Sequence, residues 1–567
     1  MFGGLTKTSS RIAIAAALGL TLGGFAFTAT PVQAADLGGD CCADLEERVA
    51  ELEATTVRKG NKKVSVTISG WVVKAMNFWD DGDIDSFYVG DKPDDLASRF
   101  AITGSATISP GWSAGYNLTV TTPASVFGFG SNQFDEEGAS PIRFISTLYS
   151  YIYIKSDTFG AINWGYLSPA SDNPAVLADI SGTVIESNGV WFEGNSMFLR
   201  PKGAQGGQGG LSSLTWGSFL QCQGIAAGIG VDCFGSPQPA VRYDSPTWGG
   251  FRFETSYGTY STQAAGVIPT PDANFWDIAA FYTADWNSIK VSAAYAYTWM
   301  ESAINSGSFT RGFCADRFRV EALGGGFFNL ENAPDECFGD NDTLEDGQLH
   351  QFGGSIMHKP SGVGIYGMYQ HEEAGGGSRN LVGVTGFVPV LAPIGFVPKQ
   401  VFFNIGTPDT DAWYIKPFIR RAFSPIGHTV LYGEWGQYND QFSGNLGNLC
   451  PGFDRLGGTS LDNFCDTFRL TVAPNLQPIA LRQATAAFVT GSEAERWGLG
   501  VVQEIDSAAM HVWARWQHQE LDVDITGFVQ EAEIVAPGVF DARVKRQRVN
   551  QSFDDWDLFQ IGGVIFF

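Results

Sequence analysis

The feature that most constrains the fold is a strict alternation of apolar and polar residues on both sides of a tight turn, in RFAITGSATISPGWSAGYNLTV at residues 99–120. Every second residue from Phe100 to Ile108 is apolar or small, and the residues between them are mostly polar. The turn SPG at residues 109–111 follows, and the alternation resumes at Trp112. A period of two is typical of strands with one apolar and one polar face. The segment therefore predicts a β-hairpin.

The same unit, a strand, a short turn and a second strand, recurs along the chain. Further turns of this kind lie at residues 156–160, 245–250, 285–288, 358–362, 424–427 and 505–508. With the first hairpin they give seven hairpins and hence fourteen strands. One more candidate strand lies at each end, at residues 62–79 and 555–567. The sequence predicts an all-β fold, a 16-stranded antiparallel transmembrane β-barrel, and barrels of this size keep an aqueous lumen.

Longer connections separate the hairpins. We expect them to be irregular, at roughly 80–95, 121–145, 168–237, 259–274, 300–347, 373–409, 439–493 and 520–553. Short turns on one side and long loops on the other are typical of outer-membrane barrels, with the short turns in the periplasm. A secreted β-sandwich, solenoid or propeller is the alternative, but such folds need an apolar interior.

The N-terminus has the features of an export signal. Lys7 and Arg11 precede an apolar run at residues 12–27, and PVQA ends the segment at Ala34. This pattern predicts a signal peptide over residues 1–34, with a retained membrane anchor as the alternative. Its removal changes the formal charge from -25 to -27, because the segment carries two basic and no acidic residues. Such acidity argues against a nucleic-acid partner.

Residues 35–61 predict a short periplasmic helical segment ahead of the barrel at 62–567. Leu45, Val49 and Leu52 lie on one stripe with coiled-coil spacing, over barely two heptads. Three such helices would associate if the barrel is a trimer, and the alternative is a helix docked on its own barrel. Cys41 and Cys42 at its start would form a vicinal bridge or link protomers.

Three stretches carry a resemblance to a known family: CCADLEERVAELEATTVRKGNKKVSVTISGWV near the front, WGYLSPASDN at residues 164–173, and the terminal GGVIFF. With them the chain resembles outer-membrane porins of the α-proteobacterial, rhizobial type. The resemblance implies a passive, homotrimeric pore for small hydrophilic solutes and ions, in contact with outer-membrane lipid and lipopolysaccharide. The terminal Phe567 resembles the signal that the barrel-assembly machinery reads in outer-membrane proteins.

In trimeric porins the loop after the fifth strand folds inward and narrows the lumen, and the strand count places residues 168–237 there. As this constriction loop, the segment carries the acidic residues Asp172, Asp179, Glu186 and Glu193. An external lid with solvated charges is the alternative. Alternation assigns eight basic residues to the lumen face of the wall: Arg99, Arg242, Arg252, Lys290, Lys416, Arg420, Arg496 and Arg515. Acidic side chains on the loop that face basic side chains on the wall predict an electric field across the lumen. The net negative charge of the chain predicts modest cation selectivity.

Six further cysteines fall in pairs within long connections: Cys222 with Cys233, Cys314 with Cys337, and Cys450 with Cys465. We expect disulfide bonds, because the setting is exported and oxidising. A metal site is the alternative, although no pair has C-x-x-C spacing and the six histidines do not gather beside the cysteines.

We expect neither enzymatic activity nor a cofactor. The chain lacks a G-x-S-x-G elbow, a Walker A loop and an H-E-x-x-H motif. The competing function is that of a closed barrel acting as a surface receptor or adhesin through its long loops. The apolar stretch at residues 383–403 would serve that role, cover the centre of a trimer, or form an extra external hairpin.

Overall fold

The computed structural model describes residues 64–90, 97–122, 133, 145–188, 194, 197–204, 210–212, 214–220, 237–260, 273–300, 314–315, 318–323, 327–332, 336–337, 347–373, 381–390, 395–404, 408–442, 469–472, 478–536 and 539–567. The chain divides into two units, Met1–Thr67 and Ile68–Phe567. The signal peptide, the helical segment and its residues Cys41, Cys42, Leu45, Val49 and Leu52 lie outside the described residues. Within them, no helix combines the length and apolarity needed to cross a membrane.

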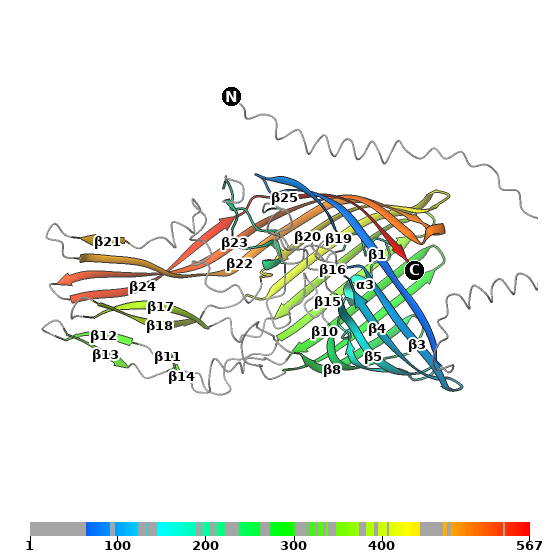
Figure 1. The fold of residues 1–567 in the computed structure, drawn as a ribbon, viewed down its shortest axis with the longest axis horizontal. Helices are drawn as coiled ribbons and strands as arrows, with labels where there is room; N and C mark the ends of the chain where they lie inside the picture. The colour runs from blue at the N-terminus through cyan, green and yellow to red at the C-terminus, as the bar shows by residue number, and fades with distance from the viewer. Residues whose placement is uncertain are drawn as a thin grey trace, which may run out of the picture. The chain divides into compact units, whose positions relative to one another are not determined.

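The second unit is a closed antiparallel barrel (Figure 1). Its sixteen wall strands are β1 (Ser65–Asp80), β3 (Arg99–Ser109), β4 (Trp112–Thr121), β5 (Ser146–Ser156), β6 (Gly160–Leu167), β7 (Gln238–Asp244), β8 (Phe251–Tyr260), β9 (Ala273–Trp286), β10 (Ile289–Met300), β15 (Gly347–His358), β16 (Val363–Glu373), β19 (Thr410–Ser424), β20 (Gly427–Asn439), β22 (Pro478–Ile505), β23 (Met510–Ala536) and β25 (Trp556–Phe566). β25 pairs with β23 on one side and with β1 on the other, and this closes the ring. The predicted sixteen-stranded antiparallel barrel is confirmed.

All seven predicted short turns join neighbouring wall strands. The turn at 358–362 shows why glycine is required there: Gly362 has φ +71, and a Cβ on it would lie 2.0 Å from the carbonyl oxygen of Arg420. The end of the barrel that holds these seven turns is called the short-turn end below, and the opposite end the long-connection end.

The wall strands have an outer and an inner face, as alternation requires. On β1, Val72 and Met76 are 49% and 40% exposed, whereas Val73, Ala75 and Asn77 between and beside them are buried. The same contrast recurs on later strands; on β19, Trp413 and Ile415 are exposed while Tyr414 and Lys416 are buried. The outer face is thus mostly apolar, and the inner face mixes polar, charged and apolar side chains.

The long connections are less irregular than the sequence predicts, and that expectation is corrected here. They contain β2 (Asp85–Gly90), β11 (Cys314–Ala315), β12 (Phe318–Leu323), β13 (Phe327–Asn332), β14 (Glu336–Cys337), β17 (Leu381–Val390), β18 (Gly395–Asn404), β21 (Arg469–Val472) and β24 (Val539–Ser552). In addition, β22 and β23 have 28 and 27 residues, well beyond the length that crosses a membrane. Pairing between strands therefore continues past the barrel wall. The hairpin interpretation of residues 383–403 is confirmed, because β17 pairs with β18.

Candidate functional site

The connection between β6 and β7 lies against the inner face of the wall. Its described residues, 168–188, 194, 197–204, 210–212 and 214–220, are called the inward loop. They include the short helix α3 (Pro174–Leu177), which lies among the wall strands in Figure 1. Nearly every polar contact between this loop and the wall involves an inner-face side chain, so the loop occupies part of the lumen.

The first anchor of the inward loop is Asp277 on β9, which is fully buried. Its carboxylate accepts hydrogen bonds from the backbone N–H and hydroxyl of Ser171, at 2.8 and 2.7 Å, and from the backbone N–H and hydroxyl of Ser256. The hydroxyl of Ser256 in turn accepts from the N–H of Ala170 at 2.9 Å. The motif WGYLSPASDN thus has a structural role: it supplies Ser171 to a buried carboxylate.

The second anchor is the close packing of α3 on β15 and β16. Gly353 lies under this helix, and a Cβ on it would be 2.1 Å from the carbonyl oxygen of Ala175. The hydroxyl of Tyr366 donates to the same oxygen at 2.9 Å, and Ser355 donates to the carbonyl of Ala178 at 2.7 Å. Only glycine at position 353 allows the helix backbone to approach the wall so closely.

The third anchor is an ion pair between Lys416 on β19 and Asp179 on the loop. Lys416 Nζ lies 2.6 Å from Asp179 Oδ2, and both side chains are fully buried. The same ammonium donates to Thr183 Oγ1 at 2.8 Å and to the carbonyl of Ser187 at 2.6 Å. Lys416 therefore holds three residues of the loop, Asp179 through its charge and Thr183 and Ser187 through hydrogen bonds.

Two further groups of contacts, around Glu186 and Glu434, hold the inward loop against β20 and β23. Glu186 is fully buried; its Oε1 lies 2.9 Å from His511 Nδ1, and its carbonyl accepts from Arg515 Nη1 at 2.7 Å. Next to it, Glu434 Oε2 accepts from Ser187 Oγ and, at 2.6 Å, from the hydroxyl of Tyr414.

The far part of the inward loop is held by a buried arginine. Arg200 forms two parallel hydrogen bonds with Asp81, just after β1, at 3.0 and 2.9 Å. Gln133 joins them: its Nε2 donates to Asp81 Oδ2 at 2.9 Å and to the carbonyl of Phe198 at 3.0 Å. The Arg200 side chain has no exposed surface. Arg200, Asp81 and Gln133 were not among the predicted site residues.

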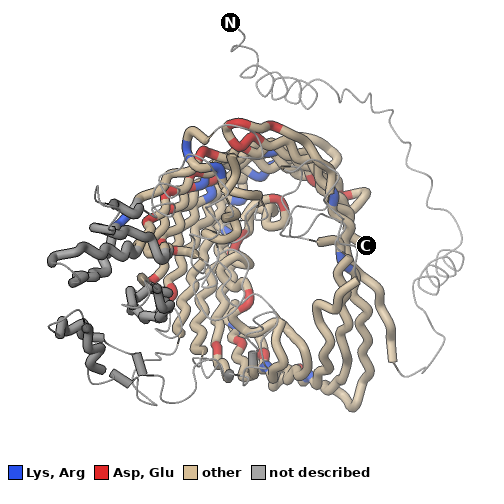
Figure 2. Tube along the Cα trace, turned by 60° about the vertical axis from the view of Figure 1, so that its left-hand side comes forward, with Lys and Arg blue, Asp and Glu red and all other residues tan. Residues whose placement is uncertain are grey.

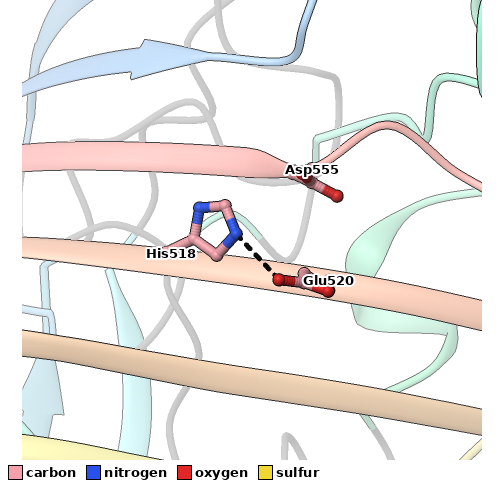
Figure 3. Close-up of side chains that lie close together, drawn as sticks. All are labelled: His518, Glu520 and Asp555. Carbon is pink, nitrogen blue, oxygen red and sulfur yellow. Dashed lines mark hydrogen bonds and ion pairs between the residues drawn. The ribbon is translucent and has the colours of Figure 1, made fainter.

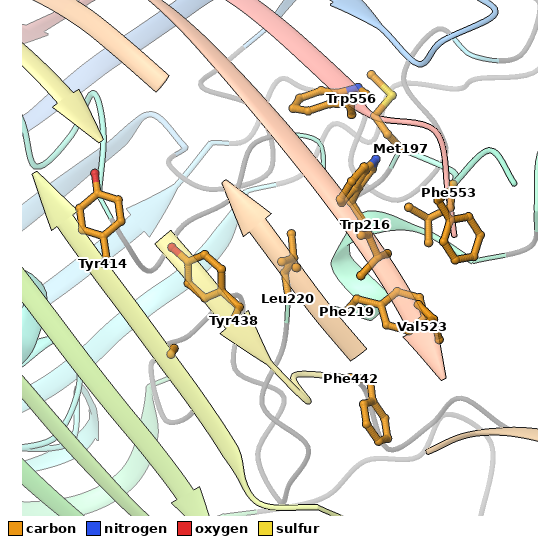
Figure 4. Close-up of a cluster of buried hydrophobic side chains, with 14 of the residues drawn as sticks. Met197, Trp216, Phe219, Leu220, Tyr414, Tyr438, Phe442, Val523, Phe553 and Trp556 are labelled. Carbon is orange, nitrogen blue, oxygen red and sulfur yellow. The ribbon is translucent and has the colours of Figure 1, made fainter. Parts of the chain in front are cut away.

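Around these contacts the loop packs into an apolar cluster with the inner wall (Figure 4). The loop contributes Met197, Leu199, Leu214, Trp216, Phe219 and Leu220, and the wall and its connections contribute Tyr414, Tyr438, Phe442, Val523, Phe553 and Trp556, among others. This cluster fills the lumen beside β20, β22, β23 and β25 with packed side chains.

The inner face on the other side of the barrel stays partly exposed. On β3, β4 and β5 most inner-face residues are half-buried or exposed, for example Ser105 and Tyr151. The side chains of Arg242 on β7 and Arg252 on β8 are 18% and 43% exposed. These inner faces, from β3 to the start of β8, are called the open wall; those of β9 to β23, under the loop, are the covered wall. Side chains of the open wall therefore remain accessible from within the barrel.

Charges on the open wall lie beside opposite charges. Arg242 Nε donates to Asp244 Oδ1 at 2.7 Å, and its Nη1 donates to the carbonyl of Ser168 at 2.8 Å. Arg252 pairs with Glu254 at 2.8 Å. Figure 2 likewise shows acidic and basic positions intermingled rather than gathered on opposite sides.

The eight basic residues predicted for the lumen all lie on the inner face, in two groups. The first group is half-buried or exposed and consists of Arg99 on β3, Arg242 on β7, Arg252 on β8 and Lys290 on β10; all but Lys290 belong to the open wall. The second group lies on the covered wall and consists of Lys416, Arg420, Arg496 and Arg515. Of the second group, all but Arg420 are buried; Arg420 makes a bidentate pair with Glu504.

Of the four predicted acidic residues, Asp179 and Glu186 are buried against the covered wall, so their charges do not face the open wall. Asp172 is half-buried and attracts Arg99 electrostatically. Glu193 lies outside the described residues.

Among the cysteines, the structure describes one predicted pair at the level of the backbone. Cys314 on β11 lies directly opposite Cys337 on β14. Residues directly opposite on antiparallel strands have Cα atoms about 4.5–5.5 Å apart, which is within the range that a disulfide bridges. Cys222, Cys233, Cys450 and Cys465 lie outside the described residues.

Comparison with known proteins gives one family match. The family described as Gram-negative porin matches residues 14–386, more than half of the chain. No curated protein matches. Similar solved structures include the anion-selective porin from Comamonas acidovorans, at 12% identity and a TM-score of 0.42, covering 89% of this chain and all of that one. Another is the Salmonella typhi OmpF complex with daunomycin, at 11% identity and a TM-score of 0.39, covering 90% of this chain and 99% of that one.

Proposed function

The chain belongs to the Gram-negative porin family and is a multi-pass β-barrel of the bacterial outer membrane, and on this premise we propose that it forms a passive, water-filled channel for small hydrophilic solutes. The observation that carries the proposal is the open wall. Its polar and charged inner face remains partly exposed although the inward loop fills the opposite side of the lumen. A barrel built only to display loops has no need of an accessible polar interior.

The inward loop is the constriction in this proposal. Its first residues, 168–173, lie against Asp277 and Arg242 at the edge of the open wall. The passage therefore runs between this edge of the loop and β3, β4 and β5. Bond chemistry plays no part in it.

We propose a modest preference for cations. The basic groups of the open wall lie beside acidic ones, Arg242 beside Asp244 and Arg252 beside Glu254, so their fields partly cancel within the passage. The net charge of the chain without its predicted signal peptide, -27, then decides which ions gather at its mouth. This preference weakens at high salt, since exposed charges are screened.

We also propose a homotrimer, with the seam between β1 and β25 at its interface. Lys74 lies on the outer face of β1 between the exposed Val72 and Met76, opposite Gly563 of β25. A lysine facing lipid near the middle of a membrane costs about 2–4 kcal/mol. A neighbouring protomer that covers this seam and offers acceptors to the ammonium would lower that cost, and the predicted N-terminal helices would then lie close together in the periplasm.

The orientation, the surroundings and the disulfides complete the proposal. The short-turn end faces the periplasm and the long-connection end faces outside, in contact with lipopolysaccharide. Cys314 is bonded to Cys337, Cys222 to Cys233 and Cys450 to Cys465, and Cys41 and Cys42 form a vicinal bridge or link protomers.

Single-channel recording of the purified protein in planar bilayers tests the channel. We expect stable open steps in multiples of three and a reversal potential in a KCl gradient that indicates cation preference. Clear anion preference would refute the selectivity alone. If no steps appear although circular dichroism shows an intact barrel, the channel is refuted and the closed receptor or adhesin is favoured.

A further inference from the structure

We propose that His518, Glu520 and Asp555 bind a divalent transition-metal cation, with Zn²⁺ as the best match, on the outer face of the barrel at the long-connection end (Figure 3). His518 and Glu520 are both on β23 and point to the same side, because they are two residues apart. Asp555 lies just before β25, the strand that pairs with this part of β23. The site is remote from the passage and goes beyond the proposed channel function.

The distance between the His518 and Glu520 ligand atoms fits a bound metal, and Asp555 is near enough to join them. One ligand atom from each of the three residues lies within 4.8 Å of the other two. His518 Nε2 and Glu520 Oε1 are 3.2 Å apart. Zinc binds nitrogen and oxygen ligands at about 2.0–2.2 Å in tetrahedral geometry, which separates neighbouring ligand atoms by roughly 3.3 Å. The imidazole and the carboxylate are therefore spaced as two ligands of one such ion.

A further carboxylate orients the imidazole. Asp557 Oδ1 lies 3.0 Å from His518 Nδ1 and accepts a second hydrogen bond from Trp516 Nε1, also at 3.0 Å. With the proton of the ring on Nδ1, toward Asp557, the lone pair of Nε2 points to Glu520 and Asp555. Histidines that bind metals commonly donate their other ring N–H to a carboxylate in this way, which fixes the tautomer.

The imidazole is also held by packing. Its ring lies 5.1 Å from the ring of Trp497 and 6.2 Å from that of Trp516, measured between centroids. The His518 side chain is only 13% exposed, whereas that of Glu520 is 54% exposed. The nitrogen ligand is thus fixed in place, and the oxygen ligands are open to the surroundings, so an ion can enter without rearrangement of the wall.

The donor set indicates the class of metal. One imidazole with two carboxylates suits Zn²⁺ and similar transition-metal ions, whereas Ca²⁺ and Mg²⁺ prefer oxygen ligands alone. Three protein ligands leave one tetrahedral position for water or another outside oxygen donor. Because the ligands come from β23 and from the residue just before β25, a bound ion would link these two strands at the rim of the barrel.

Calorimetric titration of Zn²⁺ into untagged, chelator-stripped protein in detergent tests the site. We expect His518→Gln and Glu520→Gln each to remove one equivalent of bound Zn²⁺ per chain. Asp557→Asn should keep that equivalent but weaken it by about 10- to 100-fold, as loss of an orienting partner does. His371→Gln is the matched control, because His371 forms the same 3.0 Å contact with an outer-face aspartate, Asp411, on other strands.

Far-UV circular dichroism of each variant checks that the barrel is intact. The site is refuted if wild-type protein takes up no Zn²⁺, or if His518→Gln binds as many equivalents as wild type. It is also refuted if His371→Gln loses the same equivalent. Binding of Ca²⁺ or Mg²⁺ as tight as that of Zn²⁺, and unchanged in His518→Gln, would show that carboxylates alone act and would refute the role of the imidazole.

Discussion

Replacing Lys416 with methionine should release the middle of the inward loop from the wall. The substitution keeps most of the length and volume of the side chain but removes its charge and all of its donors. Asp179 then remains buried without the ammonium that lies 2.6 Å away. Thr183 Oγ1 and the carbonyl of Ser187 lose the donor they share with it.

The size of the effect follows from the burial of the pair. Both side chains have no exposed surface, and breaking a buried ion pair by removing one partner costs about 3–5 kcal/mol. At 1.4 kcal/mol for each factor of ten, this raises the open population of the loop by roughly 100- to 4,000-fold. The other anchors, at Asp277 and Arg200, lie on different strands and connections and should remain closed.

Hydrogen exchange followed by mass spectrometry in detergent measures this opening. Peptides that cover residues 174–188 should lose protection by that factor, because amides such as those of Asp179 and Ser187 are bonded within the loop. Arg421→Met is the control: Arg421 is an exposed cation on the same strand. The double variant Lys416→Met, Asp179→Leu should recover much of the protection, since an apolar pair can replace a buried ion pair. Unchanged exchange in Lys416→Met would refute the view that this pair fastens the loop.

Three further predictions concern other parts of the site. Arg200→Met leaves Asp81 buried without its bidentate partner. Hydrogen exchange over residues 197–204 should rise as expected when the free energy of opening falls by about 3–5 kcal/mol, while residues 174–188 stay protected. Equal loss of protection in both segments would contradict separate anchors. Gly353→Val places side-chain atoms where the Ala175 carbonyl lies. Protection of the α3 amides from hydrogen exchange should therefore fall by the equivalent of about 1–3 kcal/mol in the free energy of opening. Exchange of α3 at the wild-type rate would contradict the close packing. Arg252→Gln removes the nearer of the two arginines beside Glu254, at 2.8 Å, and leaves Arg242 at 4.0 Å. The reversal potential in a KCl gradient should therefore shift toward cations, and a shift toward anions would contradict the balance of charges on the open wall.

The sequence predicts the barrel well because its signal is local. Alternation and turn residues lie within about ten positions of each other, and consecutive strands pair with each other through the seven short turns. The lengths of β22 and β23 were underestimated for a related reason. A strand was expected to end where the membrane ends, yet alternation and pairing both continue beyond it.

The partners of the inner-face charges could not be predicted in this way. Alternation places Lys416 on the inner face but does not show that Asp179, more than two hundred residues earlier, meets it there. Arg200 was missed because it lies outside any strand, where alternation assigns no face. Its neighbours Met197 and Leu199 were the available signal, since apolar residues in a loop indicate that the loop packs against something.

Because the lumen has an open and a covered wall, the residues that determine permeability differ from those that hold the inward loop. Substitutions on the inner faces of β3, β4 and β5 change the chemistry that a passing solute meets, yet they touch few of the contacts that hold the loop. Substitutions under the loop do the opposite. Variants of this protein can therefore acquire new permeability through the first region while the second preserves the fold, so natural variation in what passes should be concentrated on one side of the barrel.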